Sequence, residues 1–170
     1  RLFYSTTTEA TPVVGTRIAA SKLDATRLLR AAAVPVPDNA LAPTFDHALE
    51  AAGRLGWPVV VKPADRECGE GATAGITDPE DLRLAWDKAR ALSEKPMVER
   101  HVEGREYRLL VVDGTLFWAF ERAPAQVVGD GRSSVAQLVA AWNEGRRVGR
   151  ASGHARTAIT LDDEALAVLA

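Results

Sequence analysis

The sequence predicts an α/β protein, with a small α/β lobe followed by the start of a second lobe that is built on an antiparallel sheet. Helical and strand-like apolar patterns alternate up to about residue 100, which is typical of the first lobe. The dipeptide Asp113-Gly114 then joins two apolar runs, and this is one of the best short-range signals of a β-hairpin. In addition, 46% of the 170 residues are apolar, so the chain can bury a real core.

Two helices are expected before the first long strand. Ser21 can cap a helix over residues 22–32. Thr44 can cap a second helix over residues 45–55, in which apolar side chains keep helical spacing until Gly56 ends it. Both helices therefore begin with a signal that is encoded in adjacent residues.

Two strands are expected around a loop that is rich in glycine. Residues 57–63 form a short β-branched run bounded by prolines, which is typical of a strand buried on both faces. Residues 64–75 are polar and contain several glycines, so we expect a mobile loop there. Residues 96–102 again have the composition of a strand, whereas residues 34–37 are too rich in proline for a central strand.

Further elements are expected on both sides of that second strand. Asp78 followed by Pro79 is a strong helix start, with apolar positions that continue to Leu92. Ser134 and Gln137 form a capping box for a later helix. The hairpin strands are expected over residues 107–112 and 115–120, a basic loop over residues 145–156, and a last helix over residues 162–170.

Three segments follow from this order of elements. We expect an extended segment over residues 1–14, the small lobe over residues 15–101, and the start of the second lobe over residues 102–170. The hairpin of the second lobe would need another layer to cover it.

Composition and charge exclude several classes of protein. The chain has 21 basic and 23 acidic side chains, mixed along its length, so we expect no nucleic-acid partner. No apolar run approaches the roughly 20 residues that a membrane helix requires, so we expect no membrane partner either. The single cysteine, Cys68, cannot form an internal disulfide, and we therefore expect a reducing compartment, the cytoplasm.

Lys62 is the first candidate for binding chemistry. It follows residues that are expected to be dry strand, and a buried ammonium group is costly to place without a partner. A phosphate would be such a partner, because a unit charge pair at about 4 Å is worth roughly 4 kcal/mol at an effective dielectric constant of about 20. The alternative, in which Lys62 reaches the surface from a strand end, stays open on these residues alone.

The glycine-rich loop after Lys62 is the second candidate. Gly69 and Gly71 would let backbone N–H groups approach an anion closely and close over it as a flap. The loop is not a Walker-type P-loop, because no Gly-Lys-Ser/Thr sequence opens a helix. A plain connector between two strands remains the simpler alternative.

Charged residues in the predicted hairpin are a third candidate. The period of a strand places Glu106 and Arg108 on one face, with Tyr107 and Leu109 on the other. For any one of these charges, a solvated sheet face is the simpler interpretation.

Hydrolytic and zinc sites lack support in the sequence. The histidines are far apart, and no pair has the spacing of metal ligands. There is no Gly-x-Ser-x-Gly motif, and no base is identified that would activate Cys68 as a nucleophile.

Taken together, these segments resemble the ATP-grasp ligases, most closely the branch that contains cyanophycin synthetase and the synthetase domain of bifunctional glutathione-forming enzymes. The similarity covers roughly residues 15–145, and several short pieces in the family's order are hard to obtain by chance. The matching stretches are residues 20–29, 34–37, 57–63, 98–112 and 122–131.

The resemblance implies a fold of two lobes with ATP between them. It assigns Lys22 and Lys62 to the phosphates of ATP, with the loop around Gly69 and Gly71 folding over them. The segment 99–102 would be the hinge that reads adenine, through the side chain of Glu99 and through main-chain groups, and the next strand would bind the ribose. The residues implied are Glu99, His101 and Val102 for adenine, and Glu106 for the ribose hydroxyls.

The resemblance also assigns Arg108 and Arg122 to the phosphoryl group or to the carboxylate on the acceptor side. An arginine suits that task because its planar guanidinium group holds a phosphate or a carboxylate at two points and stays charged. These two arginines are the candidate catalytic residues.

The implied activity is that of a carboxylate–amine ligase, which forms an amide or peptide bond through an acyl phosphate. ATP and Mg²⁺ are the implied cofactors, and a carboxylate and an amine, from an amino acid or a peptide, are the implied substrates. In such enzymes the magnesium-binding acid and a Glu-x-Asn pair come after the position of Leu161, so we assign no metal ligand to this chain. Because Met97 is the only methionine, we expect the chain to be a central slice of a larger ligase.

Two other hypotheses stay open. The chain could be a nucleotide-binding or regulatory module of ATP-grasp shape that does not catalyse, and a Glu-x-Asn pair downstream of residue 170 would favour the enzyme instead. It could also be an α/β interaction domain whose charged strand faces are solvated, and this domain would give no saturable heat with ATP or ADP. The sequence does not decide whether the chain forms a homo-oligomer.

Overall fold

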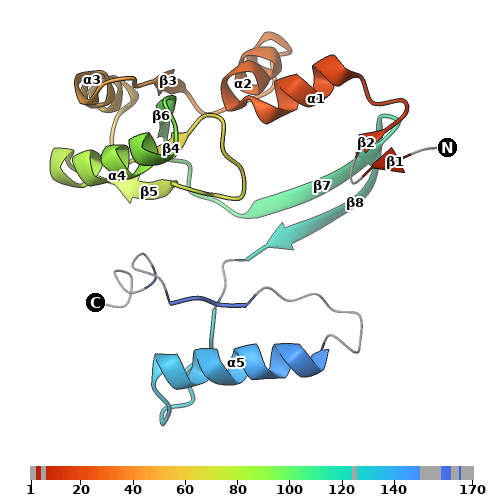
Figure 1. Ribbon diagram of the computed structural model, residues 1–170, viewed down its shortest axis with the longest axis vertical. Coiled ribbons are helices and arrows are strands. Elements are labelled where there is room, and N and C mark those ends of the chain that lie inside the picture. The colour runs from red at the N-terminus through yellow and green to blue at the C-terminus, as the bar shows by residue number, and fades with distance from the viewer. Residues whose placement is uncertain (1–2, 5–6, 124–125, 150–157, 162–164, 166–170) are drawn as a thin grey trace. The chain divides into compact units, whose positions relative to one another are not determined.

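The structure, a computed structural model, describes residues 3–4, 7–123, 126–149, 158–161 and 165 (Figure 1). The chain divides into two compact units, Arg1–Glu103 and Gly104–Ala170. The assignment of these residues to the two lobes of one enzyme stays a prediction.

The first unit contains a four-stranded sheet with the strand order β3-β6-β4-β5, in which every neighbouring pair is antiparallel. A separate ladder pairs β1 with β2. The elements are β1 (Phe3–Tyr4), β2 (Thr7–Thr8), α1 (Val13–Ala20), α2 (Lys22–Ala31), β3 (Asn39–Leu41), α3 (Phe45–Leu55), β4 (Val59–Pro63), β5 (Thr73–Ile76), α4 (Pro79–Leu92) and β6 (Pro96–Arg100).

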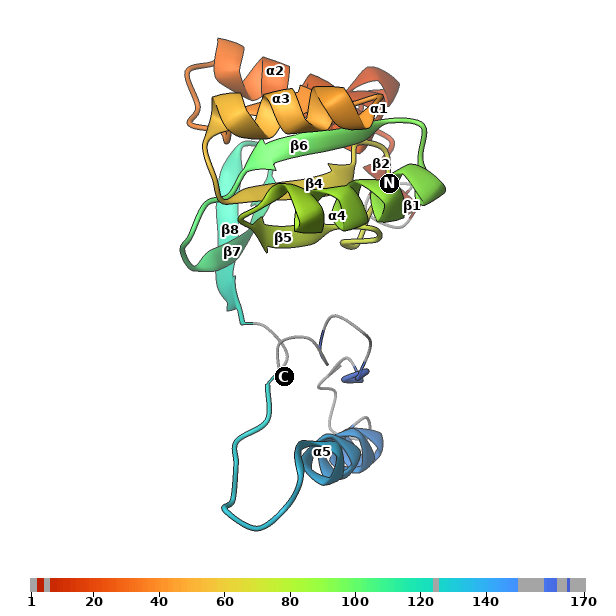
Figure 2. The ribbon, with the colours of Figure 1, turned by 90° about the vertical axis from the view of Figure 1, so that its left-hand side faces the viewer.

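The core lies between one face of this sheet and helices α3 and α4. Figure 2 shows α3 running beside β6 and α4 running beside β4 and β5. Val59, Val61 and Val98 point from the central strands into this core, where they are fully buried. Small side chains on the helices, mainly alanines, allow the close approach, and Leu82 fills the space between them. Because side chains alternate along a strand, Val60 and Lys62 point to the opposite face.

The predicted helices α2, α3 and α4 are confirmed, and so are their caps. Ser21, Thr44 and Asp78 each accept a hydrogen bond from a backbone N–H in the first turn of the helix that follows. Gly56 ends α3 with a φ of 81°. The proline-rich segment 34–37 forms no strand, as expected.

The start of the chain differs from the sequence prediction. Residues 1–14 were expected to be extended throughout, but the helix α1 begins at Val13. The Pro12 carbonyl oxygen accepts hydrogen bonds from both the N–H and the hydroxyl group of Thr16. No side chain caps the start of α1 and no residue of it is buried, so neither a capping residue nor a core-facing side marks this helix in the sequence.

The central strands differ in two ways. The strand expected over residues 57–63 is fully buried on one face and half-buried on the other, because Val60 and Lys62 are partly exposed. The loop expected over residues 64–75 is shorter, because β5 begins at Thr73. Gly75 lies inside β5 with a φ of 74°, and this glycine made the strand look like loop.

The second unit contains the hairpin of β7 (Glu106–Val112) and β8 (Thr115–Arg122), as predicted. Asp113 and Gly114 take φ values of 49° and 72°, which a two-residue hairpin turn requires. Every residue of both strands is exposed within the described part of the chain, including large apolar side chains such as Trp118. This agrees with the expectation that the hairpin needs another layer to cover it.

Helix α5 (Val135–Gly149) follows the hairpin. The capping box is confirmed, since Ser134 and Gln137 each accept a hydrogen bond from the other's N–H. The basic loop expected over residues 145–156 is wrong over its first part, because the helix continues through Gly145. A single glycine lowers helix stability by only about 1 kcal/mol relative to alanine.

Residues 150–157, and most of the helix expected over residues 162–170, lie outside the described residues. Among the described residues, no helix is long and apolar enough to cross a membrane.

The connection between β4 and β5 is fastened at its start to the turn that follows α4. The Ala64 N–H donates to the Lys95 carbonyl oxygen at 2.9 Å. The Ser93 hydroxyl group donates to Asp65 Oδ1 at 2.6 Å, and this hydrogen bond is the main reason why the pKa of Asp65 lies below its ordinary value of 3.8. Arg66 donates from Nε and Nη2 to the Leu92 carbonyl oxygen, at 3.0 and 2.6 Å.

The other end of the connection packs against the last residue of α4. Gly71 is buried with a φ of 70°, and a Cβ atom at this position would lie 2.7 Å from Leu92 Cδ1 and 3.1 Å from Pro63 Cγ. Gly69 has a similar φ of 79°, but no atom lies within 4 Å of the place of a Cβ. Gly71 is therefore required both for its backbone conformation and for close packing, and Gly69 only for its conformation.

Gly71→Ala should destabilise the first unit more than Gly69→Ala does. Both substitutions place an alanine at positive φ, which costs about 1 kcal/mol, and only Gly71→Ala adds overpacking against a proline ring, worth about 1–3 kcal/mol. The measurement is the free energy of unfolding in urea for both variants. An equal loss of unfolding free energy in the two variants would contradict the close packing around Gly71.

Asp65→Asn should lower stability at neutral pH and do so less at acidic pH. The folded-state pKa of Asp65 is depressed, so its carboxylate stabilises the fold above the ordinary pKa of 3.8, and this contribution is lost as the pH falls below that value. The asparagine side chain can still accept the hydrogen bond from Ser93. The substitution therefore removes only the extra strength that the negative charge gives to this hydrogen bond. Urea unfolding at neutral pH and at a pH below 3.8 measures the difference, with Asp87→Asn on the exposed face of α4 as a control. A loss that is independent of pH would be inconsistent with this contact.

Candidate functional site

Lys62 and Glu99 form the centre of the candidate site, on the sheet face opposite to the core. Val60 of β4 is paired with Glu99 of β6. Lys62 comes two residues after Val60 in β4, so its side chain lies on the same face of the sheet. Lys62 Nζ lies 2.5 Å from Glu99 Oε1, with side-chain exposures of 22% for the lysine and 15% for the glutamate. Lys62 does not simply reach the surface from a strand end, because its charge is held in a half-buried ion pair.

Lys22 lies in the same site, although it comes from a different element. It is the first residue of α2, and its N–H donates to the Ala64 carbonyl oxygen at 3.2 Å. Its Nζ donates to the Arg66 carbonyl oxygen. The connection between β4 and β5 therefore holds both the backbone and the ammonium group of Lys22.

The surroundings of Lys22 disfavour its charged form. Burial, and then repulsion from the Lys62 ammonium group, lower the pKa of Lys22 from its ordinary value of 10.5. Asp65, Glu67 and Glu99 oppose this shift with their negative charges. An anion placed against both lysines would relieve the repulsion, so the site is suited to bind a phosphate.

The end of β6 leads into the expected hinge. The His101 N–H donates to the Pro58 carbonyl oxygen at 3.2 Å, and the Arg100 N–H donates to the Asp38 carbonyl oxygen at 2.9 Å. The His101 Nδ1 atom is buried and has no hydrogen-bond partner, whereas Val102 is 64% exposed. The His101 N–H is thus engaged within the protein.

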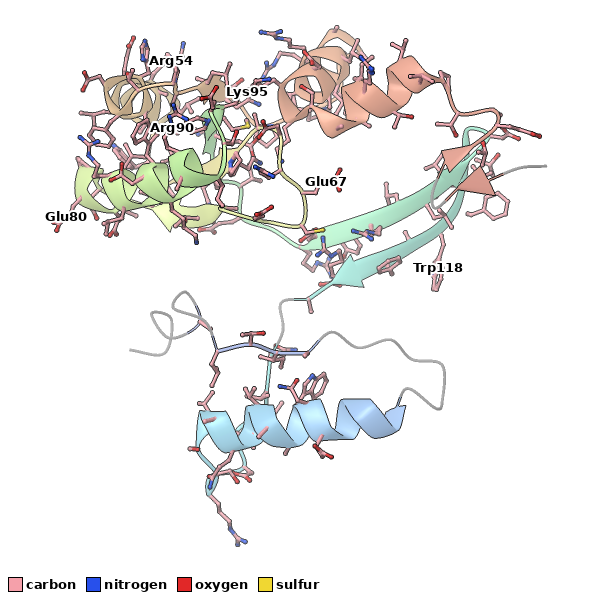
Figure 3. The ribbon with its side chains drawn as sticks, viewed as in Figure 1. Arg54, Glu67, Glu80, Arg90, Lys95 and Trp118 are labelled. Atoms are coloured by element: carbon pink, nitrogen blue, oxygen red, sulfur yellow. The ribbon has the colours of Figure 1, made fainter. Side chains whose placement is uncertain are left out.

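The glycine-rich connection carries Gly69 at an open position beside acidic side chains. Figure 3 shows Glu67 on this connection, and Glu67 and Glu70 are both exposed. Cys68 is exposed as well, in agreement with its polar surroundings in the sequence. Among the candidate glycines, Gly69 is therefore the one that is free to approach a ligand, and Gly71 anchors the connection.

Three further candidates lie together in the second unit. Glu106 is paired with Arg122 across the hairpin, and Arg122 Nη1 lies 2.5 Å from Glu106 Oε1. Arg108 lies two residues along β7, on the same face of the hairpin. Both members of the ion pair are at least half exposed, so the pair contributes little to stability.

Other candidates do not form a site. His47 Nδ1 lies 2.6 Å from Thr44 Oγ1 at the start of α3, so this histidine belongs to a helix cap. His154 lies outside the described residues. Within the described ranges, no group of three or more His, Cys, Asp or Glu side chains is placed to hold a metal ion.

Sequence reasoning missed the residues that fasten the connection, namely Asp65, Arg66 and Ser93. The carbonyl oxygen of Arg66 accepts the Lys22 hydrogen bond, and a main-chain group leaves no signal of its own in a sequence. Ser93 comes directly after α4, so its small polar side chain looked like an ordinary helix end.

Comparisons with known proteins agree with the sequence resemblance. The model of the family "Carbamoyl-phosphate synthase L chain, ATP binding domain" matches residues 21–113. Cyanophycin synthetase of Nostoc sp. is 38% identical over 159 residues, which are 93% of this chain and 18% of that protein. The glutathione biosynthesis bifunctional protein of Streptococcus mutans is 34% identical over 153 residues, 88% of this chain and 20% of that protein.

A solved structure shows the same fold. The RimK domain ATP-grasp protein from Sphaerobacter thermophilus has a TM-score of 0.55 at 21% identity, over 63% of this chain and 42% of that chain. The chain spans about a fifth of the length of the curated relatives that it matches. The family model covers more than half of the chain, and the chain therefore belongs to the family of carbamoyl-phosphate synthase L chain ATP-binding domains.

Proposed function

We propose that this chain is the ATP-binding portion of a carboxylate–amine ligase of the cyanophycin-synthetase-like type. The observation that carries the proposal is the cluster of Lys22, Lys62 and Glu99 at the base of a glycine-rich connection. The similarity to cyanophycin synthetase over 93% of the chain supports the ligase type.

In this proposal, Lys22 and Lys62 bind the phosphates of ATP. Each ammonium group is a strong hydrogen-bond donor, and repulsion between them is relieved when a phosphate lies against both. Gly69 lies at the open part of the connection that would cover the phosphates, and Gly71 holds its far end. The acidic side chains of the connection restrict how it closes on an anion.

The remaining candidates take the nucleoside and the reacting groups. Glu99 has a second carboxylate oxygen beyond the one that contacts Lys62, and this oxygen can accept a hydrogen bond from the amino group of adenine. The other proposed contacts are main-chain groups of His101 and Val102 with adenine, Glu106 with the ribose hydroxyls, and Arg108 and Arg122 with the phosphoryl group or the acceptor-side carboxylate.

The proposed reaction has two steps. A carboxylate oxygen of the first substrate attacks the γ-phosphorus of ATP, and ADP leaves, so that an acyl phosphate forms. The amine nitrogen of the second substrate then attacks the acyl carbon, loses a proton and expels phosphate, which gives the amide. The arginines would stabilise the negative charge that is passed from one group to the next.

The proposal includes Mg²⁺ with ATP, but it assigns no metal ligand to this chain. Among the described residues, no group of three or more His, Cys, Asp or Glu side chains could hold a metal ion. An amino acid or a peptide as the substrate, and the cytoplasm as the compartment, are proposed from the sequence and the family.

Lys62→Ala should weaken ATP binding by more than about tenfold, because a charge-assisted contact to a phosphate is worth about 1.5–3 kcal/mol. Calorimetric titration with ATP measures the affinity. The matched control is Arg54→Ala, which removes one positive charge from the exposed side of α3.

Removing Lys62 leaves the Glu99 carboxylate without its partner, so a second variant is needed. Lys62→Gln deletes the charge and still offers a donor to Glu99. Unchanged ATP affinity in a folded Lys62→Gln variant would refute the role of Lys62, and an absence of saturable heat in the unaltered chain would refute the proposed function.

A further inference from the structure

We propose that Arg66 is a positioning residue for Lys22, and that it acts through its own main-chain carbonyl group. The inference rests on the proposed function, because it concerns how the phosphate-binding lysines are held. It assigns a role to a side chain that is bound to the end of α4.

The side chain of Arg66 is bound to the end of α4. Its Nε and Nη2 atoms donate to the carbonyl oxygen of Leu92, which is the last residue of that helix. The last carbonyl groups of a helix have no partner within the helix and carry partial negative charge. A guanidinium group with two parallel donors therefore binds there firmly and in a single orientation.

The main chain of Arg66 is bound to the candidate site. Its carbonyl oxygen accepts a hydrogen bond from Lys22 Nζ. The side chain and the carbonyl group thus link α4 with the ammonium group of Lys22 through one residue. The contact of the side chain with Leu92 limits the movement of the Arg66 backbone, and with it the position of the carbonyl group.

The rest of the connection cannot take over this task. Ala64 and Asp65 are fastened to Lys95 and Ser93, and they precede the peptide group that Lys22 contacts. Beyond Arg66, the hydrogen bonds that the structure describes close local turns, from the Glu70 N–H to the Glu67 carbonyl oxygen and from the Ala72 N–H to that of Gly69. Arg66 is therefore the last anchored position before the segment that carries Gly69.

Lys22 needs such an acceptor because its position is unfavourable without one. Burial and the neighbouring Lys62 both act against its ammonium form. A lysine side chain is long and loses rotamer entropy when it is held in place, so an unsupported Lys22 would turn toward water. The Arg66 carbonyl group offsets these effects and holds the Lys22 ammonium group at the candidate site, where the proposed function requires it.

The first test measures the position of Lys22 without any nucleotide. The 170-residue chain is treated with a limiting amount of acetic anhydride, and acetylation of each lysine is measured by mass spectrometry. Arg66→Ala should raise the labelling of Lys22 severalfold and leave that of Lys95 unchanged. Arg66→Lys should restore part of the protection, because an ammonium group can still donate to the Leu92 carbonyl oxygen.

The matched control is Arg90→Ala. Arg90 lies on the last turn of α4, and its Nη1 atom donates to the Ser93 carbonyl oxygen at 3.4 Å. Figure 3 shows Arg90 and Lys95 near this end of the helix. Arg90→Ala removes a positive charge from the same helix end without touching the peptide group that holds Lys22. If Arg90→Ala raises the labelling of Lys22 as much as Arg66→Ala does, the role of Arg66 is only a general stabilisation of the helix end, and the proposal fails.

The second test measures binding. Arg66→Ala should weaken binding of ATP by about fivefold, the effect of one lost hydrogen-bonded contact, and should leave binding of adenosine nearly unchanged. Wild-type binding of ATP tests the proposed function, and lysine labelling tests the positioning. Unchanged labelling of Lys22, or an equal loss for adenosine and ATP, would overturn the positioning role even if the unaltered chain binds ATP.

Discussion

The antiparallel pairing of β4 with β6 supports both the core and the candidate site. On one face, Val61 and Val98 are paired and fully buried beneath α3 and α4. On the other face, the same ladder sets Lys62 and Glu99 close enough to form an ion pair. A shift of one residue in this register would send the valines to the site and the charges into the core. Stable packing and the placement of the charges are therefore consequences of a single register.

Acidic side chains offset the positive charges of the candidate site. Two lysines lie within reach of each other, and Asp65, Glu67 and Glu99 offset them. This arrangement explains how ammonium groups are kept on a half-buried sheet face without large destabilisation. It also means that a phosphate has to compete with carboxylates that are already present. Under the proposed function, a ligand with several negative charges would compete with these carboxylates better than a ligand with one.

Local sequence signals predicted much of the fold, but they could not predict contacts between residues that are far apart in the sequence. The caps of α2, α3 and α4 and the Asp113-Gly114 turn are encoded in neighbouring residues, so they could be predicted. Helix α1, which buries no residue, and β3, which has only 3 residues, leave no such pattern. Lys62 was a candidate because it ends a strand that the sequence predicts to be buried, whereas Lys22 was identified only by family resemblance. The contact of Lys62 with Glu99 spans 37 residues and that of Arg66 with Leu92 spans 26, so only the folded chain brings these partners together.

Both ends of the glycine-rich connection meet the end of α4, since Arg66 binds the Leu92 carbonyl group and Gly71 packs against the Leu92 side chain. The loop between them is closed by protein contacts alone. Once a loop is closed, doubling its length costs only about 0.6 kcal/mol of entropy. Insertions or replacements between Glu67 and Glu70 would thus leave the sheet intact. Evolution, or a protein engineer, can change what this loop covers independently of the fold that carries it.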